Sequence, residues 1–142
     1  MSEFVFIPAS PSQNGVVCKI SSTQTDYAYT VLEFTLPPQV AVPLHTHERE
    51  DELIFVMEGE CWVEVQGERH VATAGALIRL PKGMPHAFGN PATTPNRLQI
   101  TAIPGGLDDY FAELSALGNQ ATQEQVDALN LKYELDFSPN AP

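Results

Sequence analysis

Basic side chains are scarce in this sequence of 142 residues. Seven Lys and Arg residues stand against 18 Asp and Glu residues, which leaves a formal net charge of -11 and a pI near 4.5. Nucleic acids and anionic lipid surfaces attract proteins of the opposite charge. We therefore expect no nucleic acid and no membrane among the partners, and a small-molecule substrate instead.

Cysteine and long apolar runs are also scarce. Cys18 and Cys61 are too few for a disulfide scaffold or a cysteine-based zinc site, and we predict two reduced thiols packed in the core. No run of about 18 apolar residues is present that would span a bilayer, and the N-terminus lacks a basic segment followed by an apolar one. A soluble, cytoplasmic protein is expected.

Most of the chain has a β-rich pattern, and its length suits one domain. From about residue 4 to residue 104, short runs of β-forming residues are separated by proline, glycine, asparagine and serine. The predicted strands are Phe4–Ile7, Val16–Ser21, Ala28–Leu36, Val40–His47, Leu53–Glu58, Glu60–Val65, His70–Thr73, Ala76–Leu80, His86–Asn90 and Arg97–Ile103. We predict one all-β domain over residues 1–142, with a C-terminal helical extension over residues 105–142.

The pattern becomes helical after Gly105 and Gly106. Apolar side chains then recur at helical spacing, at Leu107, Tyr110, Phe111, Leu114 and Leu117. Thr122 and Gln125 have the spacing of a capping box, which predicts the start of a second helix. From Leu135 onward an extended strap is expected. We expect both helices to pack on the outside of the β-structure or across one of its mouths.

Three of the four histidines form a set with one carboxylate. His45 and His47 are two residues apart, which places both rings on one face of a strand; Glu52 and His86 complete the set. Imidazole nitrogens and a carboxylate oxygen bind divalent transition metals. The sequence therefore predicts a metal site inside the β-structure. His70 stands outside the set and is interpreted as a solvated residue or an indirect contact.

The spacing around these residues resembles the two motifs of the cupin superfamily. The first motif runs from His45 and His47 through Glu52 to Gly59, and only its leading glycine is replaced, by Gln39. The second motif matches at each fixed position, Gly75, Pro81, Gly83, His86 and Asn90. The resemblance implies a cupin jelly-roll β-barrel. It also implies one divalent ion of Fe, Mn, Ni, Co, Cu or Zn, held by three histidines and Glu52.

Other acidic residues close to Glu52 are rival ligands. Only Glu52 has the six-residue spacing to Gly59 that the motif requires, so Glu48, Glu50 and Asp51 are interpreted as a solvated loop.

A substrate pocket beside the metal needs apolar walls and a few polar groups. The nearest apolar candidates are Ile54, Val56, Met84 and Phe88. On the strand Arg97–Ile103 the polar residues are expected to face solvent, but if that strand is reversed, Gln99 becomes a pocket residue.

The segment from Ile103 to Phe111 makes the chain look like small single-domain, quercetin-dioxygenase-like cupins. That resemblance implies a dioxygenase for a flavonol-like or other enol(ate) substrate, with Glu52 as general base. Fold transfers better than chemistry, so two alternatives stay open. One is a non-oxidative metal-dependent isomerase, lyase or cyclase. The other is a non-catalytic small-molecule-binding cupin.

A homodimer is also expected, because cupins commonly pair through outer strands and termini. The apolar run Phe4–Ile7 and the outward-facing Trp62 are the predicted contacts, and burial within one chain is the competing explanation for both.

Overall fold

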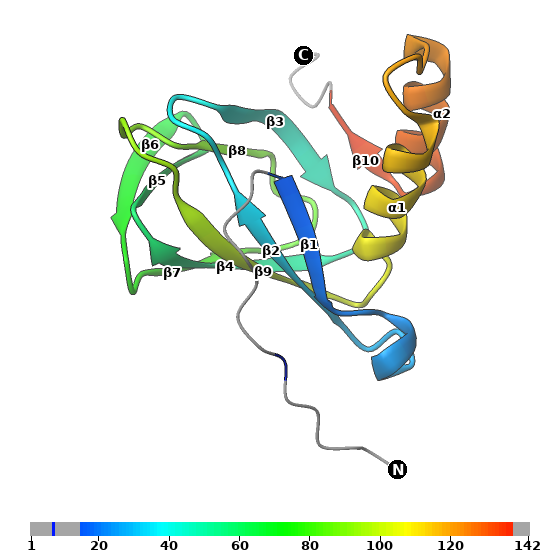
Figure 1. Ribbon diagram of the computed structural model, residues 1–142, viewed down its shortest axis with the longest axis horizontal. Helices are drawn as coiled ribbons and strands as arrows, with labels where there is room; N and C mark the ends of the chain where they lie inside the picture. Colours follow the sequence, from blue (N-terminus) through cyan, green and yellow to red (C-terminus); the bar gives the residue numbers. More distant parts are fainter. Residues whose placement is uncertain (1–6, 8–14, 138–142) are drawn as a thin grey trace.

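A computed structural model gives the three-dimensional structure and describes residue 7 and residues 15–137 (Figure 1). The elements are β1 (Gly15–Ile20), the short helix η1 (Thr23–Thr25), β2 (Thr30–Thr35), β3 (Ala41–His47), β4 (Asp51–Glu58), β5 (Glu60–Val65), β6 (Glu68–Thr73), β7 (Leu77–Leu80), β8 (His86–Gly89), β9 (Arg97–Ile103), α1 (Leu107–Leu117), α2 (Gln123–Lys132) and β10 (Leu135–Asp136). The strand predicted over Phe4–Ile7 lies outside the described residues except for Ile7, which is in no strand.

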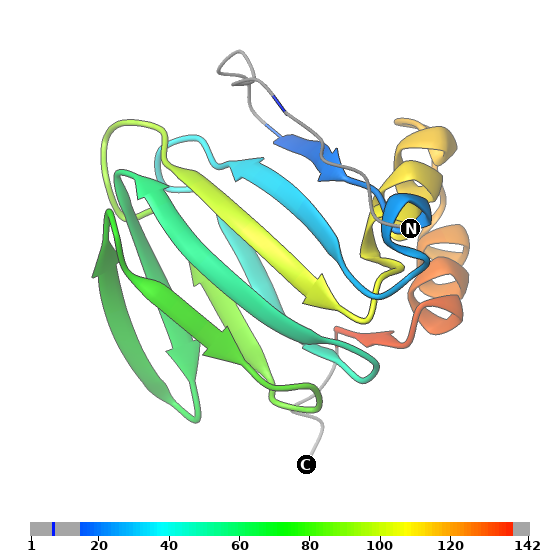
Figure 2. The ribbon, with the colours of Figure 1, turned by 90° about the horizontal axis from the view of Figure 1, so that it is seen from below.

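The strands form two antiparallel sheets of five strands each. One sheet has the order β1-β2-β9-β4-β7 and the other has the order β10-β3-β8-β5-β6. Figure 2 shows the two sheets facing each other with the helices at one end. The predicted all-β jelly roll is thus confirmed, as a sandwich whose two sheets are not closed into a barrel.

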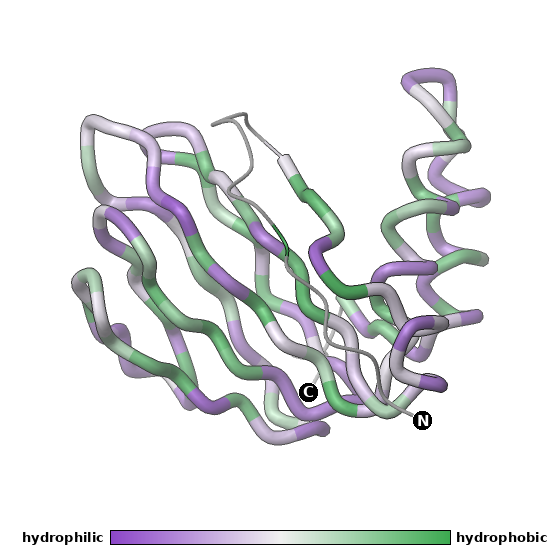
Figure 3. Tube along the Cα trace, turned by 60° about the horizontal axis from the view of Figure 1, so that its bottom comes forward, coloured by the Kyte–Doolittle hydropathy of each residue, from purple (hydrophilic) through white to green (hydrophobic). Residues whose placement is uncertain are grey.

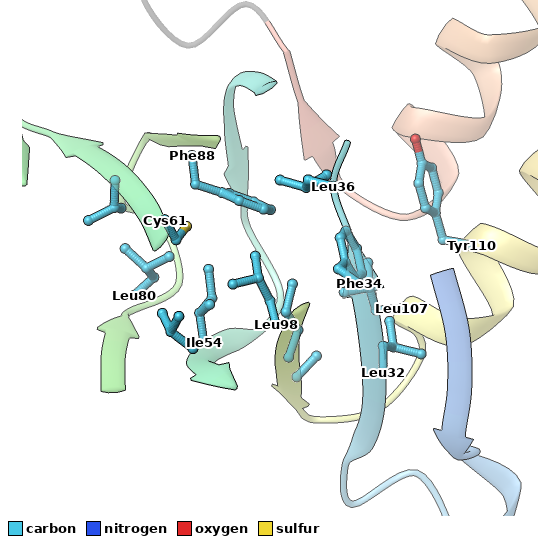
Figure 4. Packing of buried hydrophobic residues seen from close by; sticks show 14 of the residues in the cluster. Leu32, Phe34, Leu36, Ile54, Cys61, Leu80, Phe88, Leu98, Leu107 and Tyr110 are labelled. Carbon is cyan, nitrogen blue, oxygen red and sulfur yellow. The ribbon is translucent and has the colours of Figure 1, made fainter. Parts of the chain in front are cut away.

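Alternation along the strands explains why the sheets pack face to face. On β9 the side chains of Leu98, Ile100 and Ala102 are fully buried, whereas Gln99 is exposed on the opposite face. Figure 3 shows this as interleaved hydrophilic and hydrophobic positions. Each fully buried leucine or isoleucine contributes about 1.5–3 kcal/mol relative to an exposed one. The core between the sheets includes Phe88, Ile54 and Leu80 (Figure 4).

Both helices lie across one mouth of the sandwich (Figures 1 and 2). Leu107 and Tyr110 of α1 are buried, and the ring of Phe111 meets Phe34 of β2 edge-on, with ring centroids 5.4 Å apart. The Tyr110 hydroxyl donates a hydrogen bond to Asn130 of α2 over 2.7 Å. No helix in the described part of the chain is long and apolar enough to cross a membrane.

The predicted capping box at the start of α2 is confirmed. The Gln125 amide donates to the Thr122 hydroxyl over 3.1 Å, and the Thr122 amide donates to the Gln125 side chain over 2.9 Å. Both bonds satisfy backbone donors that the first helical turn leaves without a partner.

Gln39, which replaces the expected glycine, has a backbone φ of 65°, in the left-handed region that glycine favours. Its side-chain amide donates to the carbonyl oxygens of Pro91 and Ala92 over 2.8 and 3.0 Å. These two bonds hold the turn in the conformation for which a glycine was expected.

The surroundings of Cys18 differ from the prediction, and those of Trp62 agree with it. Cys61 is buried as predicted, but Cys18 is exposed on the edge strand β1, so the prediction of two core thiols is wrong for Cys18. Trp62 faces outward as predicted and is half-buried, with the Arg69 guanidinium 3.8 Å from its ring centroid and Gly89 in close contact with its ring.

Candidate metal centre

The three predicted histidine ligands come from two neighbouring strands of one sheet. His45 and His47 lie on β3, and His86 on β8 is the direct cross-strand partner of His45. Glu52 comes from β4 in the facing sheet, where it pairs with Ala102 of β9. All four side chains are buried. The predicted set, spread over 42 residues of sequence (86 − 45 + 1), thus meets between the sheets.

The reactive nitrogens of the three rings point at one another. The Nε2 atoms of His45 and His47 are 3.1 Å apart. The Glu52 carboxylate lies against the other side of the cluster, with Oε2 3.2 Å from His47 Nε2 and Oε1 3.4 Å from His86 Nε2. One nitrogen from each ring lies within 4.8 Å of the other two, so the three histidines form a group that could hold a metal ion.

In each histidine ring, the hydrogen bond of the outer nitrogen, Nδ1, determines whether the inner nitrogen, Nε2, is available to bind a metal. His45 Nδ1 lies 2.8 Å from the Pro43 carbonyl oxygen, and His86 Nδ1 lies 3.1 Å from the Met84 carbonyl oxygen. A carbonyl oxygen only accepts, so each Nδ1 carries the proton and donates it. In a neutral ring Nε2 then keeps its lone pair and points it toward the cluster.

The third ring has a different partner. His47 Nδ1 lies 2.9 Å from Oε1 of Glu50, whose exposed fraction is 3%. A carboxylate oriented on the outer nitrogen of a ligating histidine fixes the tautomer and makes the inner nitrogen more basic. Glu50 is therefore part of the site, and the prediction that it belongs to a solvated loop is wrong. Glu48 is exposed as predicted, whereas Asp51 is half-buried and accepts a hydrogen bond from the Lys82 amide over 2.9 Å.

Two polar atoms in the cluster are buried without a hydrogen-bond partner among the described residues, Oε1 of Glu52 and Nε2 of His86. Such atoms are costly to bury unless something compensates them. Two nitrogens bound about 2.1 Å from one ion at right angles lie about 3.0 Å apart, close to the 3.1 Å between His45 and His47. A divalent ion fits this donor set, and His45, His47, His86 and Glu52 are the residues that would hold it.

Burial and mutual charge set the protonation of the cluster. Burial lowers the pKa of His45 to about 4, and the charges of His86 and His47 act in the same direction. Burial also acts to lower the pKa of His47, but the hydrogen bond to Glu50 and the charge of Glu52 outweigh it, and the pKa of His47 is raised. Burial acts to raise the pKa of Glu52, but the three histidines outweigh it and lower that pKa.

A small, partly open cavity of about 90 Å³ lies beside the cluster. Its walls are mostly apolar and aromatic, and the lining residues are Phe34, Val42, His45, His47, Glu52, Phe88, Ile100, Leu107, Tyr110, Phe111, Leu135 and Phe137. Of the five predicted pocket residues only Phe88 is among them. Helix α1 and the segment around β10 supply much of the wall.

The other four predicted pocket residues lie elsewhere. Gln99 is exposed on the outer face of β9, because alternation places its neighbours Leu98 and Ile100 inside, so its prediction as a pocket residue is wrong. Ile54 and Val56 are fully buried in the core between the sheets and do not border the cavity. Met84 contributes its backbone carbonyl to His86 instead of a wall.

The C-terminal segment brings an aromatic ring to the site that no motif predicted. Strand β10 pairs with the end of β3, with Leu135 opposite His47 and Asp136 opposite Thr46. The Phe137 ring then stacks on His45, with centroids 5.2 Å apart and planes inclined by 26°. The alternation of Leu135 and Phe137 was the only local signal for this contact, and it does not indicate which strand they join.

Comparisons with known proteins agree with this geometry. The family model described as Cupin_2, cupin domain, matches residues 32–103. A curated relative, quercetin 2,3-dioxygenase from Bacillus subtilis (strain 168), is 35% identical over 48 residues. That match covers 34% of this chain and only 14% of the relative's length.

Two solved structures show the same fold. A predicted oxalate decarboxylase from Thermotoga maritima is 23% identical, with 63% of this chain and 78% of that chain covered and a TM-score of 0.60. The polyketide cyclase RemF from Streptomyces resistomycificus is also 23% identical, with 72% of this chain and 80% of that chain covered and a TM-score of 0.58.

Proposed function

Because this chain belongs to the Cupin_2 family of cupin domains, we propose that it is a metal-dependent enzyme, a dioxygenase that acts on a flavonol-like or other enol(ate) substrate. The observation that carries the proposal is the buried cluster of three imidazoles and one carboxylate, in which Glu52 Oε1 and His86 Nε2 have no hydrogen-bond partner among the described residues. The short match to quercetin 2,3-dioxygenase supports the choice of substrate class.

Three histidines and one carboxylate leave coordination positions open on an octahedral ion. Held there, a divalent transition metal would polarise the enol oxygen of the substrate as a Lewis acid and supply the electronic link to O₂. Both atoms of O₂ enter the products of a dioxygenase, so no external reductant is needed.

The chain's own residues would hold the substrate and move its proton. The lowered pKa of Glu52 keeps its carboxylate ionised at neutral pH, so that Oε1 can accept the proton of an enol hydroxyl. The Glu50 carboxylate would keep the His47 ring in one orientation during this proton transfer. The rings of Phe34, Phe88 and Phe111 exclude water and offer flat apolar surface to an aromatic enol.

The test is oxygen uptake by metal-loaded protein with a flavonol under air, in the wild type, in two site variants and in one control variant. We expect substrate loss and oxygen uptake in the wild type and loss of both in His86→Ala and Glu52→Gln, while His70→Ala keeps them. Absence of turnover across several enols and metals would contradict the proposal. Turnover undiminished under nitrogen would select a non-oxidative isomerase, lyase or cyclase, and binding without turnover would select a binding protein.

A further inference from the structure

The cavity beside the histidines is too small for a ring compound. Its volume is about 90 Å³. Pockets that bind drug-sized ligands have volumes of about 300–1,000 Å³. A substrate with even one ring therefore reaches the cluster only after part of the wall moves.

One part of the wall separates the cavity from a much larger hollow. An open groove of about 640 Å³ runs between α2 and the chain around β10. Leu135 and Phe137 line this groove, and the same two residues line the inner cavity. They are thus the partition between the groove and the candidate metal centre, and the two hollows together reach the size of a ligand pocket.

Phe137 is the part of this partition that is least fixed. Leu135 has an exposed fraction of 7% and pairs with His47, and Asp136 pairs with Thr46. Phe137 follows the last paired residue, and its exposed fraction is 41%. Beyond the burial of its area, a ring pair of the kind that it forms with His45 changes an equilibrium by only about twofold to tenfold, so this contact holds the side chain weakly.

The groove outside Phe137 is acidic. Carboxylates from Glu48, Asp127, Glu134 and Asp136 line it, and no described lining residue carries a positive charge. Their field acts over about 8 Å at physiological ionic strength and has the same sign as the net charge of the whole chain. An anion that approaches the cluster through this groove is repelled, whereas a neutral molecule is not.

We propose that Phe137 is a specificity-determining residue that controls access from this groove to the histidine cluster, and that the groove admits neutral ring compounds and disfavours anions such as free carboxylates. The inference rests on the proposed function for the identity of the cluster, and it adds the route, the residue and the charge of the ligand. The substrate class is then an uncharged aromatic enol that loses its proton only at Glu52.

The test uses two alkylating reagents of nearly equal size on the metal-free full-length chain. Iodoacetamide is neutral and iodoacetate is an anion, and both alkylate imidazole nitrogens, so peptide mass spectrometry reports the rate at His45. His70, which is exposed, serves as the reference within the same molecule. The variants are Phe137→Ala, Phe137→Trp and the matched control Phe55→Ala, because Phe55 has a similar exposed fraction of 38% and does not line the cavity.

We expect Phe137→Ala to raise the rate of iodoacetamide labelling at His45 up to about tenfold, as loss of one ring contact predicts. Phe137→Trp and Phe55→Ala should label His45 no faster than the wild type, and the rate at His70 should stay constant. At low salt iodoacetate should label His45 less than iodoacetamide does, relative to His70, and added salt should narrow the difference.

Equal labelling of His45 in the wild type and Phe137→Ala would overturn the access role of Phe137. Iodoacetate labelling as fast as iodoacetamide labelling at low salt would overturn the charge selection. Thermal unfolding of each variant shows whether it is folded, and Phe137→Trp tests the same position without opening a space. Because no metal is needed, a protein that fails to bind metal but shows the Phe137 effect would refute the proposed function and keep this inference.

Discussion

At the scale of single residues, the four ligand candidates were predictable but the residue that orients one of them was not. Motif spacing selected Glu52 over its acidic neighbours, and the structure places it against His47 and His86. Spacing gave no sign of Glu50, since a carboxylate three residues from a histidine contacts it only if the chain turns there. This turn joins β3 to β4, which belong to different sheets, so it is not a local property.

Glu50→Gln should weaken metal binding. The change keeps the shape of the side chain but removes the charge that makes His47 more basic, and loss of such a partner typically costs about 10–100-fold in metal affinity. Competition titration with a chromogenic chelator measures the affinity. Glu48→Gln removes one charge from an exposed position nearby and should leave it within about threefold of the wild type. Equal losses of metal affinity in both variants would mean that Glu50 acts only through its charge and not through its contact with His47.

Metal affinity should fall as the pH is lowered through the titration range of His47. Metal binding requires a neutral ring, and the raised pKa of His47 means that its proton competes at higher pH than that of an ordinary histidine. We expect about a tenfold loss of affinity per pH unit below that pKa from the proton that the metal displaces on His47. His45, with a pKa of about 4, should add nothing until far lower pH. An affinity that is constant from pH 8 to pH 5 would contradict histidine ligation.

At the scale of elements, runs of β-forming residues between turn residues predicted nine strands that the structure contains. Helical spacing predicted α1, and a capping box predicted the start of α2. Strand β10 was predicted only as an extended strap. A strand of two residues is too short to show a sequence pattern. The pairing of Leu135 with His47 also joins positions 88 residues apart in sequence (135 − 47). The wall of the cavity follows from this pairing, which explains why most of the predicted pocket residues were not found there.

Thr122→Ala should destabilise the protein by about 1 kcal/mol, because the variant loses the hydroxyl that caps α2. The free energy of unfolding in urea measures this loss. Thr93→Ala, in the exposed loop before β9, is the matched control and should change the stability by less than about 0.5 kcal/mol. If both variants are as stable as the wild type, α2 is not held by its capping box.

At the scale of the whole molecule, the motifs predicted the jelly roll because they fix the strands that carry the ligands. Whether two sheets close into a barrel depends on their edges. Strands β1 and β7 end one sheet and strands β10 and β6 end the other, so the structure is a sandwich. The face of β9 that carries Leu98 and Ile100 packs against the facing sheet, which places Gln99 outside.

The expected homodimer stays a prediction. Arg69 and Gly89 already contact Trp62 within one chain, which weakens one of its two supports, and Phe4–Phe6 lie outside the described residues. Sedimentation equilibrium should give twice the 15.5 kDa of one chain. A measured mass equal to that of one chain at micromolar concentration would contradict the prediction of a dimer. The proposed metal site would not be affected, because all four ligand candidates come from one chain.

The proposed metal site requires that His45, His47, His86 and Glu52 together hold one divalent metal ion. The most direct measurement is elemental analysis by mass spectrometry after the chain is equilibrated separately with Mn, Fe, Co, Ni, Cu or Zn and then desalted. We predict one ion per chain for at least one metal in the wild type and in His70→Ala, and clearly less in His86→Ala, because that variant lacks one of the three imidazole ligands. Equal metal content in the wild type and His86→Ala would contradict the claim, as would a wild type that retains none of the six metals.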